Sequence, residues 1–206
     1  MRIRLTFSKG GTLRYTGHLD LHKIWERSFR RAGLPLAYSQ GFHPKPKLQL
    51  AAALPLGFSA RAELLDFWTT EEIDLQSIPD ALKPAMPPGL EILDIHPVGD
   101  RAPALQTEVR SAEYQVIIRG DQDANKLAKR VSDLLKAAAI PRERRGKSYD
   151  LRPLIEELQL TGENEIGMRL AAREGATGRP EEVLAALEIP IQDALIERTR
   201  LILAPE

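Results

Sequence analysis

Aromatic and basic side chains are concentrated in the first fifty residues of this 206-residue chain. Six of the eleven aromatic residues lie there, interleaved with Lys and Arg. Lys and Arg bind phosphates, whereas aromatic rings and guanidinium planes stack on bases. Three of these rings belong to expected buried faces, and the other three lie beside turns: Tyr15, Tyr38 and Phe42. The residue types at the start of the chain therefore predict a surface that binds nucleic acid.

Four cations crowd the second half of an expected helix, namely Lys23, Arg27, Arg30 and Arg31. The helix dipole favours cations near a helix C-terminus, which explains some of them. Four cations within nine residues are more than capping requires. The spacing favours a phosphate or nucleic-acid surface over the alternative, an ordinary solvated face.

A loop rich in glycine and proline follows this helix, with the sequence SQGFHPKPK over residues 39–47. Its two prolines limit the freedom of the backbone, which lowers the entropy cost of ordering the loop on binding. It presents Phe42, His43, Lys45 and Lys47 close together. The alternative is a rigid crossover loop whose polar residues are incidental.

A second basic run surrounds Tyr149 and is typical either of a nucleic-acid patch or of a flexible, solvated hairpin. It consists of Arg142, Arg144, Arg145, Lys147 and Arg152. We expect six cations of the early chain to converge on one face with Tyr38 or Phe42: Arg14, Arg27, Arg30, Arg31, Lys45 and Lys47. The predicted nucleic-acid contacts are Arg14, Tyr15, His18, Arg27, Arg30, Arg31, Tyr38, Phe42, His43, Lys45, Lys47, Arg144, Arg145 and Lys147.

The formal net charge of zero conceals a sorted distribution. Residues 1–50 carry ten basic and two acidic residues, a net charge of +8, and the next three blocks (51–100, 101–150 and 151–206) carry −7, +4 and −5. Sorted charge favours a directed electrostatic surface. The alternative is that folding interleaves the blocks and cancels the field.

The histidines allow two kinds of chemistry. His18, His22 and Glu26 are spaced along one helix face, as in some metal sites, but the HExxH pattern is absent and no further ligand is near, so we predict no metal or cofactor. His18 with His43 could serve as an acid–base pair for RNA cleavage without a metal. The alternative is that His18 and Asp20 orient the first helical turn or contact a ligand.

The 206 residues contain no cysteine, which excludes disulfides, catalytic thiols and thiolate metal sites within them. The N-terminus lacks an apolar signal core, and no run approaches the ~20 apolar residues of a membrane span. We expect a cytoplasmic protein with no membrane partner.

Hydrophobic periodicity predicts an α+β protein of two domains, 1–97 and 107–206, separated by a turn-rich segment over Pro97–Gln106. Each domain is expected to follow the β-α-β-β-α-β order of a ferredoxin-like fold. The first has strands at Arg2–Ser8, Leu48–Leu54, Ala62–Thr69 and Leu90–Ile95, with helices at Thr16–Ala32 and Leu75–Met86. The second has strands at Val109–Arg119, Tyr149–Arg152, Ile166–Ala172 and Ala194–Leu203, with helices at Asp121–Ala139 and Pro180–Leu187.

Three stretches resemble the bacterial radical-SAM-linked proteins, a family of unknown function encoded beside, or fused to, B12-binding-type radical SAM proteins. They are RYTGHLDL (Arg14–Leu21), the stretch from RSFRRAG to ALPLG (Arg27–Gly57) and YDLRPLI (Tyr149–Ile155). The resemblance covers nearly the whole chain, although Gly17 stands where the family pattern has Ser. It implies a radical SAM protein as a separate partner chain, because these residues have no cysteine for the CxxxCxxC cluster loop.

Three hypotheses about function follow. By analogy with RNA-modifying radical enzymes, the first is a non-catalytic, RNA-binding or substrate-presenting partner of a radical SAM enzyme. The second is a metal-independent endoribonuclease that uses His18 or His43 and resembles CRISPR repeat-processing enzymes, although no glycine-rich loop lies near this C-terminus. The third is a protein-interaction module that docks the radical SAM enzyme without contacting RNA.

Overall fold

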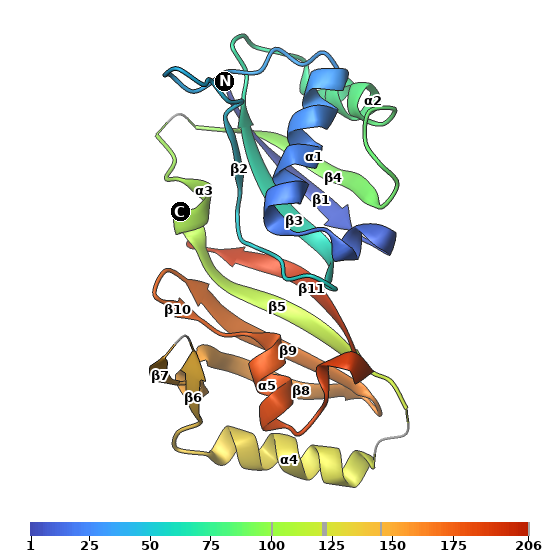
Figure 1. Ribbon diagram of the computed structural model, residues 1–206, viewed down its shortest axis with the longest axis vertical. Helices are drawn as coiled ribbons and strands as arrows, with labels where there is room; N and C mark the ends of the chain where they lie inside the picture. Colours follow the sequence, from blue (N-terminus) through green and yellow to red (C-terminus); the bar gives the residue numbers. More distant parts are fainter. Residues whose placement is uncertain (100, 121–122, 145, 206) are drawn as a thin grey trace. The chain divides into compact units, whose positions relative to one another are not determined.

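The computed structural model describes residues 1–99, 101–120, 123–144 and 146–205, and it has a mixed α+β fold. Residues 1–108 form a first unit and residues 109–206 a second (Figure 1). The expected linker over Pro97–Gln106 lies within the first unit, where it holds the end of one strand and the start of a short helix. No described helix is both long and apolar enough to cross a membrane.

The first unit is built on an antiparallel sheet whose strands are ordered β2-β3-β1-β4. These strands are β1 (Arg2–Lys9), β2 (Leu48–Leu50), β3 (Ser59–Trp68) and β4 (Leu90–Val98). The strongly apolar strand β1 therefore lies inside the sheet, between β3 and β4. Strand β2 is shorter than predicted, because the chain bends after Leu50 toward a turn.

Helix α1 (His18–Arg31) covers one face of this sheet (Figure 1). Alternate residues of β1 point toward α1 and are fully buried, as the period of two predicts. Trp25 of α1 packs on Phe7 with ring centroids 4.8 Å apart, and Phe29 stacks on Phe67 at 4.6 Å. This aromatic core holds the opposite, polar face of α1 toward solvent.

The N-terminus of α1 differs from the prediction. The helix begins at His18 behind Gly17, which makes no side-chain capping bond. The predicted cap, Thr16, instead closes a short 3-10 helix over Gly11–Tyr15, since its backbone N–H donates to Leu13. The predicted C-terminal stop is confirmed, because Gly33 adopts a left-handed φ of +70°.

The predicted helix over Leu75–Met86 is much shorter in the structure. A 3-10 turn over Leu75–Ser77 leads into α2 (Ile78–Leu82), which packs on the same core through Ile78 and Leu82. Pro79 suits the first turn of α2, where its missing N–H is not needed. Pro84 cannot donate a further helical bond, and the helix stops before it.

A buried ion network joins three elements of the first unit. Asp66 on β3 accepts hydrogen bonds from Arg2 Nη2 at 2.6 Å and from Arg4 Nε at 2.8 Å. Arg4 also pairs with Glu108 at the end of α3 (Leu105–Glu108). Burial opposes ionisation of Arg4, but these acidic partners outweigh it and raise the pKa of Arg4. The network compensates the charges of both guanidinium groups inside the protein.

In the second unit, the strands pair antiparallel in the order β8-β9-β5-β11. The short strand β10 (Ala176–Thr177) pairs with β9. The predicted last strand is confirmed residue for residue, as β11 (Ala194–Leu203). The other strands are β5 (Val109–Ile118), β8 (Ile155–Gly162) and β9 (Glu165–Arg173).

Strand β8 is absent from the sequence prediction, which ended a short strand at Arg152. The strand alternation is broken at its start, where the pairing register with β9 shifts between Ile155 and Glu157. Such a bulge places adjacent polar residues in the strand and hides the period of two. The predicted strand near Tyr149–Arg152 is instead the second half of a hairpin, β6 (Pro141–Arg144) and β7 (Lys147–Asp150).

Two helices complete the second unit. Helix α4 (Ala124–Lys136) is capped by Asp123, whose carboxylate accepts from the N–H groups of Asn125 and Lys126. Helix α5 (Pro180–Ala186) starts with proline, as predicted. Single 3-10 turns precede β8 and β11, at Arg152–Leu154 and Ile191–Asp193.

Candidate nucleic-acid interface

The exposed face of α1 carries a stripe of cations. Leu21, Trp25 and Phe29 are buried, so the residues on the opposite side of the helix face water. Four of those exposed residues are Lys23, Arg27, Arg30 and Arg31.

Acidic neighbours compensate half of this stripe. Lys23 pairs with Asp20 at 3.5 Å, and Arg30 pairs with Glu26 at 2.8 Å. Arg27 and Arg31 have neither an ion pair nor a side-chain hydrogen bond with any residue that the structure describes. Exposed pairs contribute little to stability and exchange readily with other anions. The stripe therefore offers two uncompensated charges and two that are easily released.

The loop after α1 brings further cations to the end of this stripe. The guanidinium carbon of Arg30 lies 6.0 Å from the ring centroid of Tyr38. Tyr38 pairs with Pro46 across the neck of the loop, and the N–H of Ser39 donates to the carbonyl of Lys45 at 2.8 Å. Lys45 and Lys47, which are both exposed, therefore flank the Pro46 that pairs with Tyr38.

The tip of the loop presents an aromatic ring to water. Phe42 is fully exposed, at 102% of its reference area, and His43 next to it is also exposed. A phenyl ring in this position contributes nothing to the core. We call the combined area the helix–loop surface; it consists of Arg27, Arg30, Arg31, Tyr38, Phe42, His43, Lys45 and Lys47.

Three predicted contacts lie at the opposite end of α1. Arg14 donates to the carbonyl of Gly57 at 3.0 Å, and its guanidinium lies over the ring of Tyr15, which is 70% exposed. His18 begins the helix and is half-buried. His18 and Arg30 are twelve positions apart, about 18 Å at 1.5 Å per residue. Arg14 therefore does not join the helix–loop surface.

Three early cations serve the fold instead of a ligand. Arg2 and Arg4 are buried against Asp66, and Lys9 is 1% exposed and donates to the carbonyl of Thr16 at 2.9 Å. The charge of +8 in residues 1–50 thus overstates what a ligand can meet. For Arg2 and Arg4, folding does bring basic and acidic parts of the chain together, and their positive charges are cancelled inside the protein.

The remaining predicted contacts belong to the second unit. Arg144 and Lys147 lie on the β6–β7 hairpin, and Arg145 lies outside the described residues. These residues belong to a different unit from the helix–loop surface and are not part of it.

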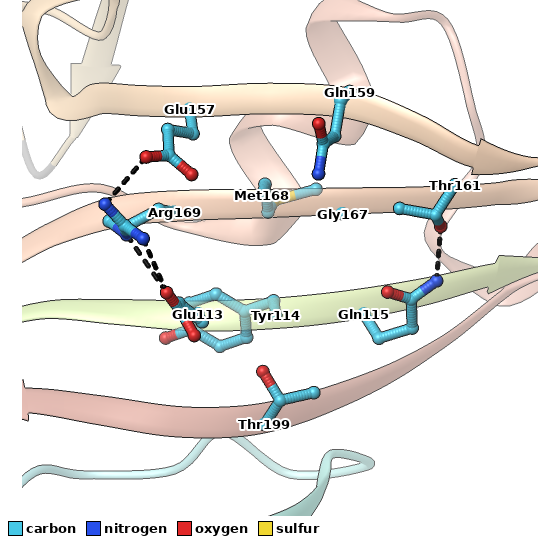
Figure 2. A pocket seen from close by; sticks show the side chains of 10 residues that line it. All are labelled: Glu113, Tyr114, Gln115, Glu157, Gln159, Thr161, Gly167, Met168, Arg169 and Thr199. Carbon is cyan, nitrogen blue, oxygen red and sulfur yellow. Dashed lines mark hydrogen bonds and ion pairs between the residues drawn. The ribbon is translucent and has the colours of Figure 1, made fainter.

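A polar pocket of about 210 Å³ lies on the sheet of the second unit, and sequence analysis did not predict it (Figure 2). Arg169 at one end pairs with Glu113 at 2.8 Å and with Glu157 at 2.7 Å. Burial disfavours the charged form of Glu113, but hydrogen bonds from Arg200 and Arg169 outweigh it and lower the pKa of Glu113. Because its cations are already engaged by carboxylates, this pocket is poorly suited to a polyanion.

The histidines gain no support as catalytic or metal-binding groups. Among the described residues, no three His, Cys, Asp or Glu side chains are placed to hold a metal ion. Glu26, the third residue of the expected face, pairs with Arg30. His43 belongs to the loop whose neck lies beside Arg30, whereas His18 is at the other end of α1. This separation weighs against an acid–base pair acting on one phosphate.

Comparison with known proteins places the chain in a family. It is similar to chains in "Crystal Structure of a Cbf5-Nop10-Gar1 Complex" (10% identity, TM-score 0.45) and in "Crystal structure of the archaeal box H/ACA sRNP Nop10-Cbf5 complex" (11% identity, TM-score 0.44). Each match covers 96% of this chain and 48% of the other, so the chain spans about half the length of these structures. Likeness at this level carries no argument about function, and no curated protein sequence matches. A family model matches residues 2–180, and the chain therefore belongs to the family described as "Uncharacterized protein conserved in bacteria (DUF2344)".

Proposed function

We propose that the protein binds RNA through the helix–loop surface and presents it, without catalysing a reaction itself, to a separate radical SAM enzyme. The observation that carries the RNA-binding part is the contact of Arg30 with Tyr38 at the neck of the loop. Tyr38 in turn pairs with Pro46, which stands between Lys45 and Lys47 in the loop that also carries the exposed Phe42.

This composition suits single-stranded RNA. Flexible cations follow a phosphate backbone, and exposed rings accept unstacked bases without demanding a sequence. Tyr38 is 40% exposed and supported by Arg30, so one of its faces is already occupied. Phe42 is open to water on both faces and is the better stacking platform. The two prolines that follow it limit the entropy lost when the loop is ordered.

The partner follows from the resemblance to radical-SAM-linked proteins. The stretch Arg27–Gly57, which carries most of that resemblance, also contains the whole helix–loop surface. The 206 residues supply no cysteine for an iron–sulfur cluster, so the radical chemistry is assigned to the partner chain.

We also propose that both units are ferredoxin-like. In the first unit, the order β4-β1-β3-β2 with all pairs antiparallel supports this. In the second, β11-β5-β9-β8 has the corresponding order, with the β6–β7 hairpin and β10 as additions. A sheet with helices on one face leaves loops and helix ends available as binding surfaces.

Fluorescence anisotropy with a labelled 15-nucleotide single-stranded RNA tests the proposal. For a single strand, the slope of log K against log salt is about −0.7 per phosphate contact. The double variant Arg27→Ala/Arg31→Ala removes two uncompensated charges, so it should weaken binding by about tenfold and reduce the slope by about 1.4. The matched control is Lys126→Ala/Lys129→Ala, which removes two exposed charges from α4.

The same experiment separates the alternatives. Equal losses in the two double variants would show nonspecific charge attraction, and absence of binding at low salt would end the proposal. Co-purification with the radical SAM partner without RNA affinity would favour the protein-interaction module. Cleavage of RNA in the presence of a chelator would favour the endoribonuclease if His18→Ala or His43→Ala abolishes that cleavage.

A further inference from the structure

An open pocket of about 620 Å³ lies beside the β6–β7 hairpin in the second unit. Its lining includes Arg144, Lys147, Tyr149 and Asp150 of the hairpin, with Gly175 from the β9–β10 turn and Thr177 from β10. The volume falls in the range of sites for small organic ligands, roughly 300–1,000 Å³. It is too large for a bare phosphate ion alone.

The pocket carries two cations that lie close to each other. Arg144 and Lys147 are directly opposite each other in the ladder, so their side chains lie on the same face of the hairpin. Like charges in directly opposed positions destabilise a strand pair. Neither side chain forms an ion pair or hydrogen bond with a residue that the structure describes. An anion bound between them would relieve this repulsion and gain two charge-assisted contacts.

The rest of the lining suits the organic part of a nucleotide. The hydroxyl of Tyr149 is buried and makes no hydrogen bond of normal geometry with a described residue, so what Tyr149 exposes is its ring and backbone. Such a ring is a stacking surface for a base. Leu154 adds an apolar contact to the same wall.

Asp150 provides an acceptor at the same site. Its Oδ1 accepts from the N–H groups of Ile140 at 2.7 Å and Arg152 at 2.9 Å. These two bonds lower the pKa of Asp150, so the carboxylate is ionised at neutral pH. Its Oδ2 makes no hydrogen bond with a described residue and is available to a sugar hydroxyl or a base amino group.

We infer that this pocket binds a nucleoside monophosphate group, with the phosphate between Arg144 and Lys147, the base on Tyr149 and a hydroxyl or amino group on Asp150. The group is either a free nucleotide or the 5′-phosphorylated end of an RNA. Every described residue that lines the pocket belongs to the second unit, so this inference is independent of the helix–loop surface of the first.

Isothermal titration of the full chain with AMP tests the inference, with adenosine and inorganic phosphate as fragments. AMP should bind saturably and more tightly than either fragment. Arg144→Ala/Lys147→Ala should weaken AMP at least tenfold, whereas Lys126→Ala/Lys129→Ala should leave it unchanged. Both pairs are surface residues, so their folding is checked by thermal unfolding. Absence of saturable binding up to 10 mM AMP, or equal losses in both double variants, would overturn the inference.

Two further arms identify the source and the role of the ring. If a 5′-phosphorylated trinucleotide binds more tightly than both AMP and its own 5′-hydroxyl form, the ligand is an RNA end. If AMP and the phosphorylated trinucleotide bind with equal affinity, the ligand is a free nucleotide. Tyr149→Phe keeps the stacking surface and should retain AMP binding, and a loss in this variant would contradict the stacked arrangement. Arg27→Ala/Arg31→Ala should not change AMP affinity, which separates this result from the test of the RNA surface.

Discussion

Phe42 illustrates how one exposed side chain separates function from folding. A phenylalanine at the tip of a loop has no packing contacts to lose, since its whole surface is open to water. Burial of apolar area stabilises a fold, and an exposed ring gives no such gain. A single exposed apolar residue is ordinary, but this one lies in a loop that also carries two prolines and two lysines. Its effect should therefore be visible in binding alone.

We expect Phe42→Ala to weaken single-stranded RNA binding by about 1–3 kcal/mol, the usual contribution of one stacked base. The melting temperature should change by less than about 1 °C, because no buried area is lost. Anisotropy and thermal unfolding measure the two effects. Phe42→Trp is the matched control, since it keeps a stacking surface and should retain affinity. Unchanged affinity in the alanine variant would remove Phe42 from the interface.

Tyr149 gives a second residue-scale prediction, which depends on pH. Burial and the nearby carboxylate of Glu182 raise its pKa to about 12, against the opposing charges of Arg144 and Arg142. An unfolded chain releases this proton near pH 10.0, so between pH 10 and 12 the folded state holds a proton that the unfolded state has lost. The contribution to stability is thus present below pH 10 and declines as pH rises through this window.

Absorbance at 295 nm should show a tyrosine ionising near pH 12. Tyr149→Phe should remove that late step. Glu182→Gln should move the step to lower pH without reaching the ordinary value, because burial remains. An absorbance step near pH 12 that is unchanged in Tyr149→Phe would contradict the described environment of Tyr149.

At the scale of elements, buried charge joins the short helix α3 to β1 and β3. One carboxylate, Asp66, serves two arginines, and its side chain is 0% exposed. Removing one partner of a buried ion group leaves the others charged and unpaired, which costs more than the group contributes when intact. Arg2 also donates to the carbonyls of Ala102 and Pro103, so it fixes the segment after β4.

Asp66→Asn should therefore lower the free energy of unfolding by about 3–5 kcal/mol. Asp20→Asn is the matched control, because it breaks only the exposed pair with Lys23 and should cost less than about 1 kcal/mol. Urea denaturation measures both. Similar effects in the two variants would show that the Asp66 network contributes no more than a surface pair.

Turns that connect the elements are set by glycine in two different ways. Gly33 ends α1 with a φ of +70°, but a Cβ there would meet nothing within 4 Å. Gly89, before β4, has a φ of +95°, and a Cβ there would lie 2.6 Å from the carbonyl oxygen of Gly10. The backbone N–H of the same Gly10 donates a hydrogen bond to the carbonyl oxygen of Gly89. The second position therefore has both strain and a clash.

Gly33→Ala should destabilise the protein by about 1 kcal/mol, the usual cost of a left-handed non-glycine residue. Gly89→Ala should cost at least twice as much, because the backbone of Gly10 must also move. The midpoints of urea unfolding compare them directly. A smaller destabilisation in Gly89→Ala than in Gly33→Ala would contradict the close approach of Gly89 to Gly10.

At the scale of the whole molecule, the net charge of zero does not give the charge of the surface that a ligand would contact. Part of the N-terminal positive charge is neutralised inside the first unit by Asp66 and Glu108, which come from the later chain. What remains outside is a smaller set on α1 and the loop after it. Net charge governs solubility and long-range attraction, whereas a binding site depends on which charges stay exposed.

Local patterns in the sequence determine much of this architecture. The alternation in β1 and β11 and the helical spacing of Leu21, Trp25 and Phe29 depend only on neighbouring residues, and all were predicted correctly. The glycine that ends α1 was recognised for the same reason, since a turn needs few residues. The bulged strand β8 was missed because its irregularity depends on its pairing with β9.

The tertiary structure alone decided which charges are exposed. Arg2 and Arg4 have the same side chain as Arg27 and Arg31, yet the first two are buried by a carboxylate more than sixty positions away. Likewise, only folding sets Arg30 against Tyr38, and only pairing in the hairpin sets Arg144 opposite Lys147. The spacing of residues in the sequence predicts which side chains share one face of a helix or strand, because the geometry of such an element is local. Desolvation and neutralisation depend on residues brought in from elsewhere, and no local pattern contains them.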